Sequence, residues 1–230
     1  IMMAQSPRLD GRLLEEQGYL PVKDLLAYKV RVDFEIPRVM QVMINRFSAK
    51  ITLRTLQRNN FDEEMETLRD IFNDAWSDNW GFIPFTREEF AELGTSLRLL
   101  LPDEFIQIAE VDGKAAAFMV GLPNLNEVLI ELNGSLFPFG WLKMVQKIRN
   151  QEIRTGRIPL MGVRKQFHNT PLGLALACLV IDAPRQAGIV RGIEEVEMSW
   201  ILEDNVAMRS ILDSIGSEQY KRYRIYGKTL

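Results

Sequence analysis

The sequence predicts an α/β fold, because short strand patterns alternate with longer helical patterns along most of the chain. Two apolar runs, at 105–111 and 114–122, flank Asp112-Gly113, a dipeptide typical of a two-residue type I′ turn, and so predict an antiparallel hairpin. A third apolar run, at 158–163, predicts a buried strand, and the longer apolar run after it predicts a buried helix. Together these patterns indicate a sheet covered by helices.

The stretch from 157 to 185 is the strand–loop–helix unit around which the other elements are arranged. Thr170 is a favourable N-cap and Pro171 suits the first position of a helix, so we expect a helix to begin at Pro171. This helix is apolar on nearly all sides and should lie against the sheet with little of it exposed. The free N–H groups and dipole at its start can hold an anion, although most such units are plain scaffold.

Composition limits the class of protein. The 230-residue chain is 47% hydrophobic, which is enough for a sizeable core, and its formal net charge of -3 gives no basic excess for a nucleic-acid or acidic-membrane partner. Cys178 is the single cysteine, which excludes an internal disulfide and fits a reducing compartment. No apolar run reaches the ~20 residues of a spanning helix, and a signal-peptide layout is missing, so we expect a cytoplasmic protein.

The remaining elements follow from local patterns. We expect a first strand at 48–57, a helix from Phe61 to about Trp76, and a second helix opened by the capping box Thr86-x-x-Glu89. The connector between these helices is aromatic and either packs in the core or lines a pocket. A fifth strand at 194–201 has one polar face.

An amphipathic helix is expected at 139–153, with three cations on one side: Lys143, Lys147 and Arg149. A basic amphipathic helix can rest on a membrane surface. Because three cations in an acidic chain give little attraction to lipid, we expect this helix to pack on its own domain, and we expect no membrane partner.

Two segments near opposite ends of the sequence resemble each other. Residues 1–4 look like the end of a strand, and a helix at 8–17 and an extended segment at 21–33 follow. With one constant offset, five positions match: Leu13 and Ile211, Leu14 and Leu212, Gly18 and Gly216, Lys23 and Lys221, Tyr28 and Tyr226. We interpret this as an internal repeat. A chance match of two helix–strand units is the alternative.

The order of elements from Ile51 to Leu230 resembles the GNAT superfamily, the acetyl-CoA-dependent N-acetyltransferase fold. The resemblance implies a mixed, largely antiparallel twisted sheet of about six or seven strands with helices on both faces. Strands one to four should be antiparallel neighbours, and strands four and five should be parallel across the helix at Pro171. Residues 48–230 would form a complete domain, and 1–47 would close an incomplete first domain of a tandem protein. If that fragment exposes a strand edge, either the complete domain or a second copy covers it, which makes a homodimer through 1–47 possible.

The resemblance also implies acetyl-CoA as cosubstrate. In the family, a loop of the form Gln/Arg-x-x-Gly-x-Gly/Ala cradles the pyrophosphate of coenzyme A, and the matching positions here are 168–173. Gly173 fits, whereas His168 and Pro171 depart from the pattern, and Pro171 removes one amide donor. The residues expected to hold the cofactor are Met161, Gly162, Val163, Arg164, His168, Asn169, Thr170, Leu172, Gly173 and Asn205.

Acyl transfer to an amine requires removal of a proton from the acceptor and protonation of the leaving thiolate. We take Glu197 as the candidate base. The family's tyrosine, seven residues after its asparagine, corresponds to Leu212, so Tyr223 in the last strand is the candidate acid, with Tyr220 and Tyr226 nearby. No His, Cys or carboxylate cluster supports a metal.

Two functions remain open. The sequence favours an acetyl-CoA-dependent N-acyltransferase acting on a small amine or an amino-terminal group. The alternative is a non-catalytic GNAT-like ligand-binding or interaction module, which Pro171 and Leu212 favour.

Overall fold

A computed structural model describes residues 8–98, 101–135 and 137–229. The predicted strand end at 1–4 lies outside these ranges. The elements, with η for short 3-10 helices, are α1 Arg8–Glu16, β1 Leu20–Arg31, α2 Arg38–Phe47, β2 Ile51–Thr55, η1 Arg58–Asn60, α3 Phe61–Trp76, α4 Arg87–Leu97, η2 Asp103–Phe105, β3 Ile106–Val111, β4 Lys114–Pro123, α5 Asn126–Glu131, α6 Gly140–Arg149, β5 Thr155–Val163, η3 Lys165–Phe167, α7 Pro171–Val190, β6 Glu195–Leu202, α8 Val206–Ser214 and β7 Glu218–Gly227.

The described residues form one seven-stranded sheet in the order β2-β3-β4-β5-β6-β1-β7. Neighbouring strands are antiparallel except β5 and β6, which run parallel across α7. The predicted hairpin is present: Asp112 and Gly113 both have positive φ, at 52° and 72°, as a type I′ turn requires. The predicted fold class and strand directions are therefore confirmed.

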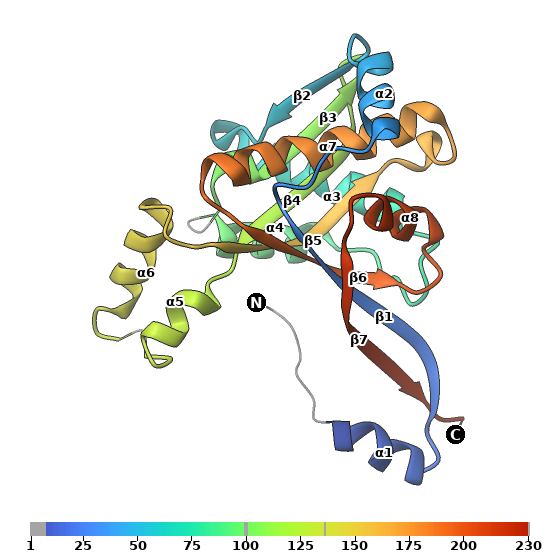
Figure 1. The fold of residues 1–230 in the computed structure, drawn as a ribbon, viewed down its shortest axis with the longest axis vertical. Helices are drawn as coiled ribbons and strands as arrows, with labels where there is room; N and C mark the ends of the chain where they lie inside the picture. Colours follow the sequence, from blue (N-terminus) through green and yellow to red (C-terminus); the bar gives the residue numbers. More distant parts are fainter. Residues whose placement is uncertain (1–7, 99–100, 136, 230) are drawn as a thin grey trace.

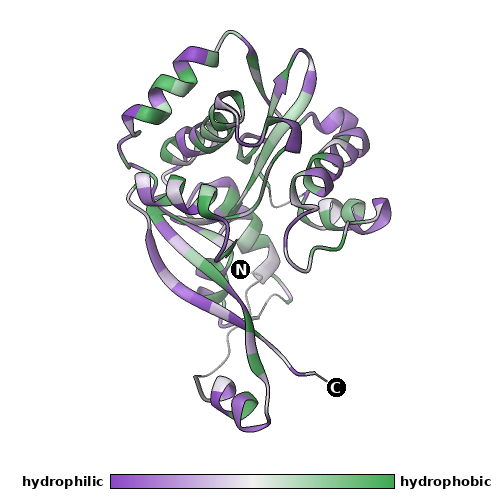
Figure 2. Ribbon diagram, turned by 90° about the vertical axis from the view of Figure 1, so that its right-hand side faces the viewer, coloured by the Kyte–Doolittle hydropathy of each residue, from purple (hydrophilic) through white to green (hydrophobic). Residues whose placement is uncertain are grey.

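Helices cover both faces of this sheet (Figure 1). On one face, α3 and α4 pack over β3 and β4 around Leu68, Ile71 and Phe118. On the other, α7 crosses the sheet and is flanked by α2 and α8. Figure 2 shows the apolar colouring concentrated where these layers meet. Each face thus has its own apolar core.

Helix α7 begins as predicted. Thr170 caps it by accepting a hydrogen bond from the Gly173 amide at 3.0 Å, and Pro171 takes the first position. By length and composition it is the one helix in the described ranges that could cross a membrane. It instead packs on the sheet, with Leu176, Cys178 and Val180 fully buried. A long apolar helix in a protein core has the same length and composition, so these two properties alone do not indicate a membrane span.

The position of Cys178 gives a first testable expectation. Burial raises the pKa of its thiol to about 11, so the reactive thiolate is scarce at neutral pH. Iodoacetamide should leave Cys178 unlabelled in the folded protein and label it in urea, as read by mass spectrometry. Rapid labelling under native conditions would mean that α7 opens locally.

Strand β1 lies inside the seven-stranded sheet. It pairs with β6 along one edge and with β7 along the other, and Leu26, Tyr28 and Val30 are buried. The predicted repeat units are both helix–strand pairs, and Gly18 and Gly216 both have positive φ after their helices. The edge that suggested a homodimer is covered within the chain, while the domain boundary at 47 and the oligomeric state stay predictions.

The helix expected to pack on its own domain packs on α5 rather than on the sheet. Helix α6 ends earlier than predicted, at Arg149, and none of its residues is buried. It lies against α5, and the two helices project away from the sheet (Figure 1). The sequence pattern identified an amphipathic helix correctly. It could not show that α5, rather than the sheet, is the surface on which the apolar side of this helix packs.

Candidate active site

The site forms where two parallel strands separate. Within the described ranges, β5 and β6 pair only from Thr155 and Glu195 to Ile158 and Met198. Beyond that point β5 continues alongside β4 to Val163, and β6 continues alongside β1 to Leu202. The two strands therefore leave a gap at the middle of the sheet, next to Pro159 and Ser199.

A cavity of about 840 Å³ lies over this gap, between the sheet and the α3–α4 layer. Arg157 and Ser199 of the sheet and Glu89 and Glu92 of α4 are among its polar lining residues. Its apolar lining comprises Leu25, Phe72, Trp76, Trp80, Phe82, Ile83, Phe85, Leu93, Leu97, Val120, Leu122, Pro159, Leu160, Trp200, Leu202 and Ile225. The aromatic connector therefore lines a pocket, and Phe72, Phe82 and Phe85 also pack together in the core.

Glu197 belongs to a chain of hydrogen bonds beside this cavity, which we call the Glu197 network: Arg157, Ser199, Glu197 and Tyr220. Arg157 is only 6% exposed, and its guanidinium donates from Nε to Ser199 Oγ at 3.1 Å. Ser199 Oγ in turn donates to Glu197 Oε1 at 2.6 Å, and the Tyr220 hydroxyl donates to Glu197 Oε2. Arg157 Nε also lies 3.7 Å from Glu197 Oε1. A buried cation and carboxylate are thus joined through one hydroxyl.

The network holds Glu197 in its charged form. Burial alone would raise the pKa of Glu197, but hydrogen bonds from Ser199 and Tyr220, together with Lys221 and Arg157, outweigh it and lower the pKa. Burial and the Glu197 charge both raise the pKa of Tyr223, whose ring lies 6.0 Å from that of Trp200. An ionised carboxylate and a protonated phenol therefore lie beside the cavity, although neither residue is part of its lining, and they can accept and donate a proton respectively.

The loop between β5 and α7 contains two cations that could meet an anion, Arg164 and Lys165, and both are paired with acids of α3 or of the turn after it. Arg164 donates from Nε to the Ala115 carbonyl at 2.8 Å and from Nη2 to Asp70 at 2.6 Å. Lys165 Nζ lies 2.6 Å from Asp78. These carboxylates are exposed, so phosphate groups could replace them at little cost.

His168 has a structural hydrogen bond. Its Nε2 lies 2.7 Å from the Val163 carbonyl oxygen, which can only accept, so Nε2 carries the proton. This bond holds the loop back against the end of β5. Asn169, the next residue, has φ of 57°, which turns the chain toward the start of α7.

Gly173 is required by the loop. A Cβ at this position would overlap the Phe167 carbonyl oxygen, and the Gly173 amide already donates to Thr170 Oγ. We expect Gly173→Ala to lower the free energy of unfolding by about 1–3 kcal/mol, as overpacking does. Gly188→Ala is the matched control in the same helix, because a Cβ there meets its nearest atom at an ordinary 3.6 Å. Urea unfolding measures both; equal stabilities would show that the loop yields freely.

The remaining predicted cofactor residues have packing roles. Met161 accepts a hydrogen bond from Trp76 Nε1 at 2.9 Å through its carbonyl, and Gly162 packs against Phe118 and Ala75. Leu172 packs in the α7 core, and Asn205 Oδ1 caps α8 by accepting from the Met208 amide at 3.1 Å. None of these roles tests cofactor contact, which stays a prediction.

The structure adds three residues that the sequence did not single out for catalysis. Arg157 and Ser199 complete the Glu197 network. Tyr220, named above only as a neighbour of Tyr223, contacts Glu197, while Tyr226 lies near Glu15. A signal was present, because Glu197 and Ser199 are two residues apart on one face of a strand. The contact with Arg157 requires the pairing of β5 with β6, which no local pattern gives.

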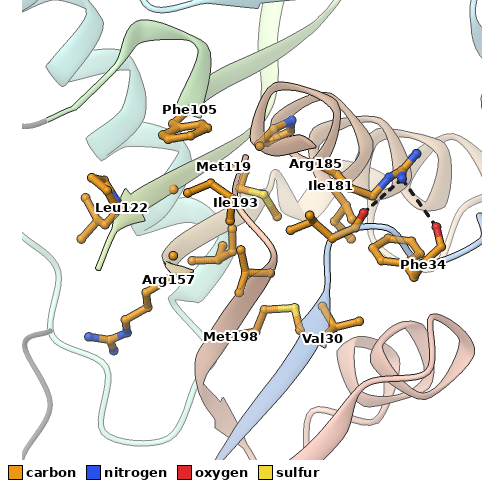
Figure 3. A pocket seen from close by; sticks show the side chains of 18 of the residues that line it. Val30, Phe34, Phe105, Met119, Leu122, Arg157, Ile181, Arg185, Ile193 and Met198 are labelled. Atoms are coloured by element: carbon orange, nitrogen blue, oxygen red, sulfur yellow. Dashed lines mark hydrogen bonds between the residues drawn. The ribbon is translucent and has the colours of Figure 1, made fainter. Parts of the chain in front are cut away.

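A second cavity, of about 60 Å³, lies on the α7 face of the sheet. Figure 3 shows its apolar lining, including Phe105, Met119 and Ile193, with the Arg157 guanidinium directed away from it. Arg185 closes one side by donating to the Val32 and Phe34 carbonyls at 3.2 and 3.5 Å. The polar groups of the site therefore lie on the opposite face from this cavity.

Solved structures with the same arrangement define the class of fold. The GCN5-related N-acetyltransferase from Sphaerobacter thermophilus superposes with a TM-score of 0.59 at 20% identity, covering 97% of this chain and 57% of that chain. A tandem GNAT protein from the clavulanic acid biosynthesis pathway gives 0.53 at 14% identity, covering 97% and 59%. The chain therefore has the GNAT fold.

Sequence comparison gives nearer relatives. The chain is 46% identical over 218 residues to protein YghO of Escherichia coli (strain K12), covering 94% of this chain and 56% of that protein. It is 39% identical over 231 residues to the bacterial ceramide synthase of Caulobacter vibrioides, covering 100% and 60%. The chain thus spans little more than half the length of either relative. No protein-family model matches it.

Proposed function

We propose that the chain is the acyl-CoA-dependent N-acyltransferase domain of its protein, and that its acceptor amine carries a long apolar chain. The observation that carries this proposal is the Glu197 network beside a large apolar cavity, at the gap between β5 and β6. The name of one relative supports the acceptor class, since a ceramide is the amide of a fatty acid and a long-chain amino alcohol. This replaces the small amine expected from the sequence.

In the proposed reaction Glu197 accepts one proton and Tyr223 donates one. The amine nitrogen attacks the thioester carbonyl, the new C–N bond forms as the C–S bond breaks, and Glu197 accepts the proton that the amine loses. Tyr223 donates a proton to the departing thiolate. Arg157 and Ser199 orient the Glu197 carboxylate and keep it charged.

Coenzyme A supplies the activated acyl group when it is bound. Its thiol end would enter the gap between β5 and β6, and its pyrophosphate would meet the start of α7 with Arg164 and Lys165. Acetyl-CoA and longer acyl-CoA thioesters are both compatible with the proposal.

The test combines binding with turnover. Calorimetry with acetyl-CoA and with a long-chain acyl-CoA measures the affinity, and release of free thiol on adding a long-chain 2-amino alcohol measures transfer. We expect turnover with the long-chain amine to exceed that with ethanolamine, because only the former fills the apolar cavity. Equal rates with both amines would overturn the acceptor class while leaving acyl transfer in place.

A non-catalytic ligand-binding module is the second candidate, and the α7 loop favours it. Pro171 lacks an N–H, and the Gly173 amide is already bonded to Thr170, so fewer donors face a pyrophosphate. Binding of ligand with no release of thiol for any amine would favour this candidate. The variants described in the Discussion separate the two.

A further inference from the structure

The hairpin of α5 and α6 is a separate surface with its own chemistry. It joins β4 to β5 and projects from the body of the domain (Figure 1). Helix α6 contacts α5, its side chains Met144, Val145 and Ile148 are half-buried, and none of its residues is fully buried. The face of α6 that points away from α5 is therefore open to a partner outside this domain.

Large apolar side chains are exposed on this hairpin. Phe137 is 83% exposed and Phe139 71%, and Ile130, Trp141 and Leu142 are exposed as well. Single exposed apolar residues are normal, but five within 13 residues of one projecting hairpin form a concentration that marks an interaction site. We call these five residues the hairpin tip.

The charge of the hairpin differs in sign from that of the rest of the chain. Residues 126–154 contain four cations and three acids, a net charge of +1, so the remaining residues carry -3 minus +1, or -4. Helix α6 itself contains Lys143, Lys147 and Arg149 and no acid. Glu131 of α5 pairs with Lys147 at 2.6 Å, while its distance to Lys143 is 3.8 Å. Arg149 is exposed.

We propose that the hairpin docks this domain on the surface of a phospholipid bilayer that contains anionic lipid. Aromatic rings at the tip suit the boundary between head groups and acyl chains, and the nearby cations suit lipid phosphates. The net charge of +1 on residues 126–154, against -4 on the rest of the chain, favours anionic lipid as the occupant. The exposed apolar tip, which the sequence pattern did not show, supplies the attraction that the three cations alone were expected to lack. A ten-residue helix is too short to span a bilayer, so the five exposed side chains before it and at its start would insert only to a shallow depth. The proposal is independent of the proposed catalytic function.

Vesicle binding tests the apolar part. The protein should co-sediment with vesicles of phosphatidylcholine and phosphatidylglycerol, and Phe137→Ser/Phe139→Ser/Trp141→Ser should lower the partition coefficient by at least about tenfold. Val39→Ser/Val190→Ser/Val206→Ser is the matched control, because these three valines are similarly exposed but lie elsewhere. Circular dichroism and thermal unfolding of each variant check that it folds. Equal binding by both triple variants would overturn the proposal.

Charge reversal tests the electrostatic part. Lys143→Glu/Arg149→Glu should weaken binding to these vesicles by about tenfold or more, whereas Lys50→Glu/Lys114→Glu, with the same change in net charge at two exposed lysines elsewhere, should have a smaller effect. Brominated lipid should quench Trp141 fluorescence, and Trp141→Phe should lose that quenching while still binding. Sedimentation velocity tests the alternative occupant. If the protein is a dimer that Phe137→Ser/Phe139→Ser/Trp141→Ser dissociates, and it does not bind vesicles, the tip is an interface between copies and the lipid proposal fails.

Discussion

Replacing Glu197 with glutamine is expected to lower the rate of acyl transfer by roughly 10²–10⁴-fold, because the amide cannot accept the proton that the acceptor amine loses. The Glu197 carboxylate is held by Ser199 and Tyr220, and glutamine has nearly the same shape, so the loss should appear in kcat more than in cofactor affinity. Free thiol release under saturating substrates measures kcat, and calorimetry measures the affinity for acyl-CoA.

Matched variants on the same strands separate chemistry from packing. Tyr223→Phe should reduce kcat by a similar factor, while Tyr226→Phe should not, because Tyr226 contacts Glu15 at the far end of β7. Glu195→Gln, two residues earlier in the same strand, is the control for Glu197→Gln. If Glu197→Gln and Tyr223→Phe both retain full activity, neither residue handles the proton and another acid–base pair must be sought.

The pH profile follows from the directions of the two pKa shifts. The pKa of Glu197 is lowered, so its charged form is lost only as pH falls below the ordinary glutamate range, and the pKa of Tyr223 is raised, so its proton is lost only above the ordinary tyrosine range. Between these limits both groups keep their working forms. If the rate falls on the acidic side near neutral pH, we therefore attribute the fall to protonation of the acceptor amine. The midpoint of that fall should move when an acceptor of different pKa is used. A midpoint that stays fixed would point to a protein group.

Deleting residues 1–33 is expected to abolish soluble folding. The deletion removes β1, leaves the facing edges of β6 and β7 unpaired, and takes buried Leu26, Tyr28 and Val30 from the core. Each such loss costs about 2–5 kcal/mol, so together they approach or exceed the whole stability of a typical domain, about 5–15 kcal/mol. Solubility on expression and size-exclusion chromatography measure the outcome.

A shorter deletion and a point variant provide the controls. Deleting 1–17 keeps β1 and removes α1, so a folded protein is expected. Leu26→Ala should lower the free energy of unfolding by about 2–5 kcal/mol, whereas Leu20→Ala in the same strand should change it little, because Leu20 is exposed. A soluble, equally stable product of the 1–33 deletion would show that β1 is a dispensable arm.

Local chemistry was enough to predict most elements. The type I′ signal at Asp112-Gly113, the Thr170-Pro171 helix start and the Thr86 capping box each depend on a few neighbouring residues, and each is present. The family resemblance added the strand directions. By contrast, the length of α6 was predicted wrongly, and its position on α5 rather than on the sheet could not be predicted, since an amphipathic pattern does not show which surface the helix will cover.

Part of the candidate site could likewise be predicted from local sequence, and part depends on the tertiary structure. By itself, the sequence determined the helix that begins at Pro171, the polar face bearing Glu197 and Ser199, and the tyrosines of the last strand, because these depend on the periods of helices and strands. Only the tertiary structure decided that β5 and β6 part after Ile158 and Met198, that Arg157 meets Ser199, and that Tyr220 rather than Tyr226 contacts Glu197. Those contacts join residues 23 and 42 positions apart, and their formation depends on strand register, which the whole sheet and its two covering layers fix together.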